Sequence, residues 1–172
     1  MDQLTGDAFN QLFRDFKRSA FHLELRDEYA VAEEVEPIRR WRAHEPDDYE
    51  WIREWHELIK AATTAGKTVT RARVVTEPVS EYVRFEHAMA RFNVAAGERL
   101  YWVPRQRTTG IAFPEHDFWL LDDELVAFNI FVEDGSSFGA ELVTDPVVVD
   151  GCLRVRDQVL AVGIPHEEYI PT

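Results

Sequence analysis

The segment over residues 115–131 constrains the fold most, because it reads as two short apolar strands joined by an acidic turn. The turn is Asp122-Asp123-Glu124, and His116 stands at the start of the first strand. Two strands that meet at a short turn pair as an antiparallel hairpin. The segments before and after are therefore expected to pack around this hairpin.

Upstream of the hairpin, the hydrophobic pattern switches between helical and strand periods. Helices are expected over residues 5–18, 33–41, 47–65 and 80–97, with Thr5 and Ser80 as N-caps and Gly66 and Gly97 as stops. Strands are expected over residues 20–26, 67–75 and 100–103. Downstream we expect a turn at 133–136, a strand over 138–143, and a helix that Asp145-Pro146 opens and Gly163 ends.

This order predicts an α/β fold, a single domain with a mixed sheet flanked by helices. At 172 residues and 45% hydrophobic, the chain suffices for one well-buried core. The strands within residues 50–103 are expected to pair in parallel through a right-handed crossover. We assign residues 1–49 to an N-terminal extension, 50–164 to the core and 165–172 to a polar tail.

Charge and composition exclude several classes of protein. The net charge of −13 disfavours direct nucleic-acid binding, although residues 60–107 carry nine Lys and Arg against four Asp and Glu. Met1-Asp2-Gln3 lacks the basic start of a signal peptide, and no apolar run reaches the roughly 18 residues of a membrane span. The single cysteine, Cys152, excludes an intramolecular disulfide and is expected in the core. We expect a cytoplasmic protein without membrane contact.

Two alternating patterns place polar groups on one side of a strand. His22, Glu24 and Arg26 share one side of the strand over residues 20–26, which we interpret as the exposed or subunit-facing side of an edge strand rather than a catalytic pair. Arg71 and Arg73 likewise face one way. The basic middle segment then either pairs with its acidic flanks or forms a local anion site.

Other candidate sites are weaker. Trp51 and Trp55 share one helix face and are predicted to be core rather than a ligand cage. His116 and the Asp122-Asp123 turn are separated by about 16 Å of extended strand, so one ion could not bind both. The sequence has no zinc, phosphate-loop or serine-nucleophile motif. No metal or cofactor is expected.

The element order over residues 51–163 resembles half of a phospholipase-D-like fold, in which one strand carries the motif His-x-Lys-x4-Asp. The corresponding positions here are His116, Phe118 and Asp123, so phenylalanine replaces the lysine. The resemblance implies that histidines of two halves or two subunits would attack and protonate a phosphodiester, and that the lysine would hold its charge. Without that cation the rate falls on the order of 10²–10³-fold. The chain therefore resembles a degenerate, non-catalytic half, and such halves commonly form homodimers.

Nearly the whole chain is also similar to an uncharacterised bacterial domain family, often encoded beside Xre-type helix-turn-helix regulators. The resemblance rests on three motifs: Val75-x-Glu77-Pro78-x-Ser80-x-Tyr82, Asn93-x-Ala95-Ala96-Gly97-Glu98 and His116-Asp117-Phe118-Trp119-Leu120-x-Asp122. It implies no activity. It does imply a regulatory setting and a basic protein as partner.

Two functions remain open. The first is a non-catalytic binding or regulatory module for a basic protein such as a helix-turn-helix regulator, steered to it by acidic segments. The second is an enzyme or sensor for a phosphorylated or otherwise anionic small molecule, which would use His116, with Asp123 as its motif partner, and the arginines Arg71, Arg73, Arg99 and Arg105. The second hypothesis requires that two or more of these arginines converge on His116 in a closed pocket.

Overall fold

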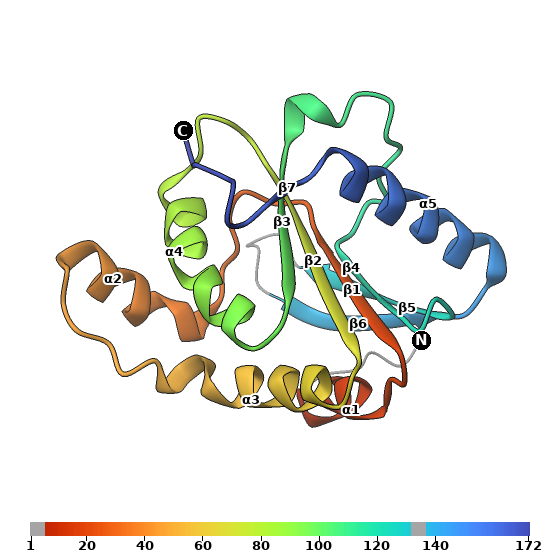
Figure 1. Cartoon of the computed structure of the whole chain (residues 1–172), viewed down its shortest axis with the longest axis horizontal. Helices are drawn as coiled ribbons and strands as arrows, with labels where there is room; N and C mark the ends of the chain where they lie inside the picture. Colours follow the sequence, from red (N-terminus) through yellow and green to blue (C-terminus); the bar gives the residue numbers. More distant parts are fainter. Residues whose placement is uncertain (1–5, 132–136) are drawn as a thin grey trace.

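The computed structural model describes residues 6–131 and 137–172. Within them, a mixed sheet of seven strands has the order β6-β5-β4-β1-β2-β3-β7 (Figure 1). The strands are β1 (Ser19–Glu24), β2 (Thr68–Val75), β3 (Arg99–Pro104), β4 (Phe118–Leu121), β5 (Leu125–Phe131), β6 (Ser137–Val143) and β7 (Ile164–Pro165). Thr5 and the turn at 133–136 lie outside the described residues.

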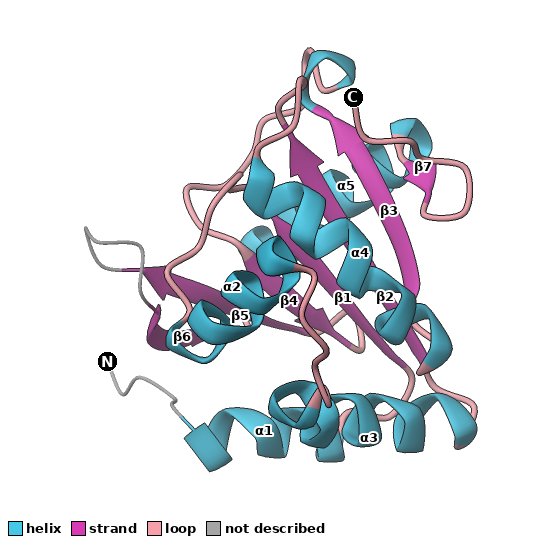
Figure 2. Ribbon diagram, turned by 90° about the vertical axis from the view of Figure 1, so that its left-hand side faces the viewer, coloured by secondary structure: helices cyan, strands magenta, loops and turns pink. Residues whose placement is uncertain are grey.

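Helices cover both faces of this sheet (Figures 1 and 2). They are α1 (Gly6–Asp15), η1 (Ala32–Glu34), α2 (Val35–Ala43), α3 (Glu50–Thr64), α4 (Glu81–Ala95), η2 (Arg105–Arg107) and α5 (Pro146–Val162). α5 lies on one face, whereas α1, α3 and α4 pack on the other. None of the helices in the described part of the chain has the length and apolar character needed to cross a bilayer.

The central hairpin is present as predicted. β4 and β5 pair antiparallel, and Leu121 opposite Leu125 closes the turn. Asp122 and Asp123 both have positive φ, which suits the short polar side chains of a tight turn. The Asp122 carboxylate also accepts hydrogen bonds from the backbone N–H groups of residues 17–19, at 2.6–3.0 Å. The turn therefore fixes the position where β1 begins.

β1 lies in the interior of the sheet, which differs from the prediction of an edge strand in an N-terminal extension. It pairs in parallel with β2 and antiparallel with β4. β2 and β3 are also parallel and adjacent, as expected for strands joined through α4. Both edges of β1 are hydrogen-bonded, and the face that carries His22 and Glu24 lies under α3 and α4, so these two residues are only 7% and 8% exposed.

The face under α5 forms an apolar core. Phe118, the residue at the lysine position of the phospholipase-D-like motif, is fully buried there with Phe21 and Leu120. Cys152 of α5 packs against the same cluster, as predicted. α5 begins as its sequence indicates, because the Asp145 side chain accepts hydrogen bonds from the N–H groups of Val147 and Val148.

The C-terminal segment is docked on the sheet. β7 pairs with β3, and Tyr169 is 5% exposed and stacked on Trp102. The Tyr169 hydroxyl donates to Glu77, and the Val79 N–H donates to the Thr172 carbonyl. The segment predicted as a polar tail, residues 165–172, thus covers part of the edge at β3.

Candidate functional site

A cavity of about 580 Å³ lies between the sheet and the helices on the face opposite α5. Its floor comes from β1, β2, β4 and β5, and its walls come from α1, η1, α3, α4 and the loop before η1. On the floor His22, Glu24, Arg71 and Trp119 are buried, whereas Val31 and Glu33 at the rim are exposed. The cavity therefore runs from solvent down to the centre of the sheet.

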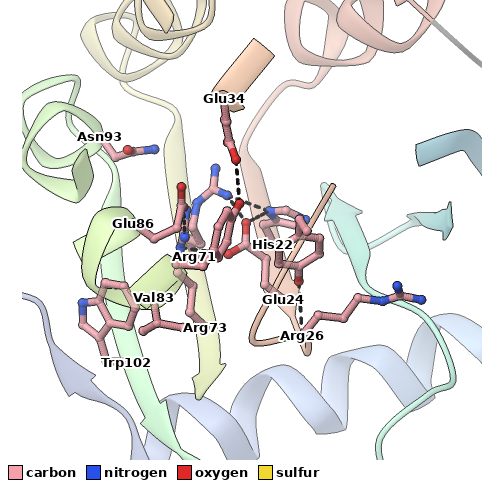
Figure 3. A network of polar contacts seen from close by, with 12 residues as sticks. His22, Glu24, Arg26, Glu34, Arg71, Arg73, Val83, Glu86, Asn93 and Trp102 are labelled. Carbon is pink, nitrogen blue, oxygen red and sulfur yellow. Dashed lines mark hydrogen bonds and ion pairs between the residues drawn. The ribbon is translucent and has the colours of Figure 1, made fainter. Parts of the chain in front are cut away.

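The charged floor follows from strand register. In the parallel pair β1–β2, His22 lies opposite Arg71, and Glu24 lies opposite Arg73. Since side chains alternate along a strand, all four project from the same face of the sheet. Figure 3 shows these side chains converging, with Glu86 approaching from α4.

The two arginines are held by three carboxylates. Arg71 donates to Glu24 and, through Nε, to Glu98 at 2.6 Å. Arg73 pairs with Glu86 and lies with its Nε 2.8 Å from Glu24. Since Glu98 and Arg71 are 3% and 6% exposed, these are charge pairs largely withdrawn from water. The arginines are therefore already neutralised by the protein.

The arginines also set the protonation of their neighbours. Burial alone would raise the pKa of Glu24, but Arg73 and then Arg71 lower that pKa to about 2. Burial lowers the pKa of His22 well below its usual value, so the imidazole is neutral. Its Nδ1 lies 3.0 Å from Arg71 Nη1, which can only donate. The proton of His22 is therefore on Nε2.

Two wall carboxyls hold their protons unusually well. Burial, and next the nearby Glu86 carboxylate, raises the pKa of Glu34 to about 7, while Tyr82 donates to Glu34 at 2.7 Å. Burial likewise raises the pKa of Asp117 to about 6, although Tyr29 donates a hydrogen bond to it. Both groups thus titrate close to neutral pH.

Aromatic rings make up much of the wall. Trp119 stacks on His22, with ring centroids 4.1 Å apart. Trp55 contacts Trp119 edge-on at 5.7 Å and also packs with the core. The lining aromatic residues are Phe9, Tyr29, Trp51, Trp55, Tyr82, Trp119 and Phe131. Trp51 and Trp55, predicted as core, thus line a cavity as well.

Unpaired polar atoms gather in this cavity. Within the described residues, five buried side-chain atoms have no hydrogen-bond partner, and all five belong to residues that line it. Two of them, Glu24 Oε2 and Arg73 Nε, face each other as an ion pair. The remaining three are His22 Nε2, Trp51 Nε1 and Asn129 Oδ1. Buried polar atoms are almost always hydrogen-bonded in native proteins, so this concentration points to a binding site.

The predicted site residues separate into two groups. Arg71 and Arg73 line the cavity, whereas His116 and Arg105 are not among its lining residues in the described ranges. Arg105 instead donates to the Leu25 carbonyl at 2.7 Å and to Thr76. Asp123 pairs with Arg156 at 2.6 Å, and Arg99 is exposed.

The phospholipase-D-like motif is not assembled around the cavity. Phe118 points to the α5 face, opposite the cavity, and His116 is half-buried in the loop before β4. The arginines therefore converge on His22 rather than on His116. No cluster of three metal-ligating side chains occurs in the ranges 6–131 and 137–172.

Several site residues escaped the sequence-based prediction, chiefly Glu34, Glu86 and Glu98. Part of the signal lay in the family-like motifs. Tyr82 comes from the first motif, Asn93 from the second, and both line the cavity. Asp117 and Trp119 come from the third. Segments far apart in the chain thus supply a common site.

Comparison with known proteins agrees with the fold and leaves the function open. Residues 7–171 match the model of a domain of unknown function, DUF6879. None of the curated protein sequences matches the chain. Among solved structures, the phosphatidylserine synthase of Haemophilus influenzae Rd KW20 superposes with a TM-score of 0.51 over 94% of this chain, at 10% identity. The chain spans 37% of that synthase, and the likeness supports the predicted mixed α/β fold with a phospholipase-D-like neighbour.

Proposed function

Because this chain belongs to the DUF6879 family, a domain of unknown function, we propose its role from the site: a cytoplasmic, non-catalytic module that binds a basic protein partner. The observation that carries the proposal is the charge of the cavity. Five carboxyl groups line it, against two arginines. Those arginines already form ion pairs with carboxylates, so the cavity carries an excess of carboxyl groups over cations.

The partner class rests on the family resemblance and on long-range electrostatics. The net charge of −13 attracts a positively charged protein surface and speeds its encounter. The resemblance to domains encoded beside Xre-type helix-turn-helix regulators suggests that such a regulator is the partner. Its binding to this module would then regulate DNA binding without this chain touching DNA.

The alternative, an enzyme or sensor for an anionic small molecule, has one observation in its favour. Arg71 and Arg73 do converge beside a histidine, His22. A phosphate entering there would have to displace Glu24 and Glu86 from the arginines, and it would meet further carboxyls in the wall. Like charges repel more strongly in a buried site than in bulk water. We therefore rank this function second.

The proposal is tested by co-purification of the full chain with an Xre-type helix-turn-helix regulator from the same genome. We expect a complex that survives about 50 mM salt and weakens at about 500 mM, because salt screens surface charge. In parallel, hydrolysis of bis(p-nitrophenyl) phosphate is measured for the wild type, His22→Ala and His116→Ala. Absence of the complex would contradict the proposal, and hydrolysis lost in either variant would establish the enzymatic alternative.

A further inference from the structure

We propose that the cavity is the receptor for a single cationic side chain, a guanidinium or alkylammonium group, presented by the basic partner. This inference rests on the proposed function and identifies the chemical group that its site recognises. It is carried by three features of the cavity: unmatched carboxyl groups, aromatic walls and unpaired polar atoms.

The carboxyl groups lie where an incoming cation could meet them. Glu24 on the floor and Glu86 on α4 contact the arginines. Glu34 accepts a hydrogen bond from Tyr82, and Asp117 accepts from Tyr29 and from the Leu25 backbone N–H; among the described residues neither forms an ion pair with Arg71 or Arg73. Glu33 continues the negative charge to the exposed rim. A cation that enters from the rim can thus meet Glu33, Glu34 and Asp117 without displacing the ion pairs of the floor.

The rings of the wall suit the same ligand. Cations bind over the faces of tryptophan and tyrosine, most strongly where water is excluded. The protein already uses this contact, because the Arg71 guanidinium lies 5.5 Å from the centroid of Trp119. Trp51, Trp55 and Tyr29 offer further ring surface within the cavity.

The unpaired polar atoms of the cavity indicate which groups the ligand carries beside its positive charge. His22 Nε2 and Trp51 Nε1 are N–H donors without acceptors in the described part of the chain. The Asn129 side chain adds a third unused polar group. A peptide supplies carbonyl acceptors next to its cationic side chain, so a basic peptide segment fits this set. The volume of about 580 Å³ lies in the range of small-molecule pockets, large enough for one long side chain.

Because Glu34 in the wall of the cavity titrates near neutral pH, the affinity for a cation should depend on pH. Burial and the Glu86 carboxylate hold the pKa of Glu34 at about 7, so Glu34 is half-protonated near neutrality. An entering cation stabilises the charged form and lowers that pKa. Binding should therefore release protons near pH 7 and become tighter as pH rises from 6 to 8.

The experiment is a calorimetric titration of the full chain with three probes: agmatine, the peptide acetyl-Gly-Arg-Gly-amide, and the same peptide with neutral citrulline in place of arginine. We expect the arginine peptide to bind at least about tenfold more tightly than the citrulline peptide, because charged hydrogen bonds are stronger than neutral ones. Proton release is measured from the dependence of the heat on the buffer. Binding of agmatine as well would show that the free cation suffices; binding of the peptide alone would show that the carbonyl acceptors are required.

Variants connect the result to the cavity. Glu34→Gln should weaken binding of the arginine peptide about tenfold at pH 8. Glu54→Gln, which removes an exposed carboxylate of α3 outside the cavity, should leave binding unchanged. The melting temperature of each variant verifies folding.

The inference is overturned if the citrulline peptide binds as tightly as the arginine peptide, if neither cationic probe binds, or if inorganic phosphate competes with them. These outcomes are separable from failure of the proposed function. If a regulator still forms a complex with Glu34→Gln, the proposed partner is correct, but the cavity is not where it binds. If the cationic probes bind the cavity but no basic protein forms a complex, the cation site is correct and the proposed protein partner is wrong.

Discussion

Glu24 shows how a single residue determines the electrostatics of the site. Its carboxylate contacts both Arg71 and Arg73, and it lies 3.3 Å from His22 Nδ1. Placed between two guanidinium groups, it remains ionised although it is only 8% exposed. Of the three carboxylates that hold the two arginines, Glu24 is the one that contacts both.

Glu24→Gln should therefore be strongly destabilising. The substitution leaves the two arginines with two carboxylates, Glu86 and Glu98, and removes the group that contacts both. Removing one member of a buried charge network typically costs about 3–5 kcal/mol of unfolding free energy. Glu124→Gln, at the exposed pair with Arg18, is the control and should cost less than about 1 kcal/mol. Urea denaturation at pH 7 measures both, and equal midpoints would contradict a structural role for the network.

Glu34 provides a second prediction at this scale. Since its pKa is raised to about 7, the folded chain retains a proton that the unfolded chain loses near pH 4.5. More protons bound in the native state means that stability falls as pH rises, here between about pH 4.5 and 7. Glu34→Gln removes this pH dependence. The unfolding free energy of the variant relative to the wild type should therefore be higher at pH 8 than at pH 5, by on the order of 1–2 kcal/mol. Urea midpoints at both pH values are the measurement, and an unchanged difference between variant and wild type would refute it.

At the scale of elements, hydrophobic periodicity was enough to locate most helices and strands. α4 and α5 carry helix-period stripes with cap residues, and β2 and the β4–β5 hairpin have apolar runs bounded by turn residues, so these were predicted to within a few positions. β7 was missed because two residues carry no period. The parallel neighbours β2 and β3 followed from chain order.

The placement of β1 could not be predicted in the same way. The alternation of His22 and Glu24 has the period of a strand whether the polar side faces water or a buried ion-pair network. Only the pairing of Glu24 with Arg73, 49 positions away, distinguishes the two, and such a distant register is not visible in a single sequence. The site was missed for the same reason, because its charges are brought together by pairing between strands.

The hairpin element supports a test of the degenerate motif. Phe118→Lys restores the residue of the phospholipase-D-like motif, yet position 118 is fully buried under α5 beside Phe21. We expect loss of about 4 kcal/mol or more of unfolding free energy, from the lost ring and a buried unpaired charge, and no gain of phosphodiesterase activity. Phe118→Leu, a smaller apolar change, should cost about 1–2 kcal/mol. A stable, active lysine variant would show that this face is catalytic.

At the scale of the whole molecule, one sheet separates two different environments. The face under α5 is apolar and closed, whereas the opposite face carries the ion pairs and the cavity. The two are joined at the edge of the sheet by the C-terminal segment, which passes from α5 through β7 and packs over β3 next to α4 (Figure 2). The last residues thus help to fix α4, which supplies Tyr82 and Glu86 to the site.

Tyr169 holds the C-terminal segment on the sheet, since it stacks on Trp102 at 5.4 Å between ring centroids and its hydroxyl donates to Glu77. Tyr169→Ala should cost about 3 kcal/mol of unfolding free energy, because a buried ring is lost and Trp102 is partly exposed. Ile170→Ala is the matched control: this neighbour is 80% exposed and should change stability by less than about 0.5 kcal/mol. Hydrogen exchange on the tyrosine variant should also show faster exchange in α4 than in α3, because Tyr169 shares a hydrophobic cluster with residues of α4 and, in the described part of the chain, with none of α3. Equal exchange in the two helices would mean that the C-terminal segment covers the sheet edge without supporting the wall of the cavity.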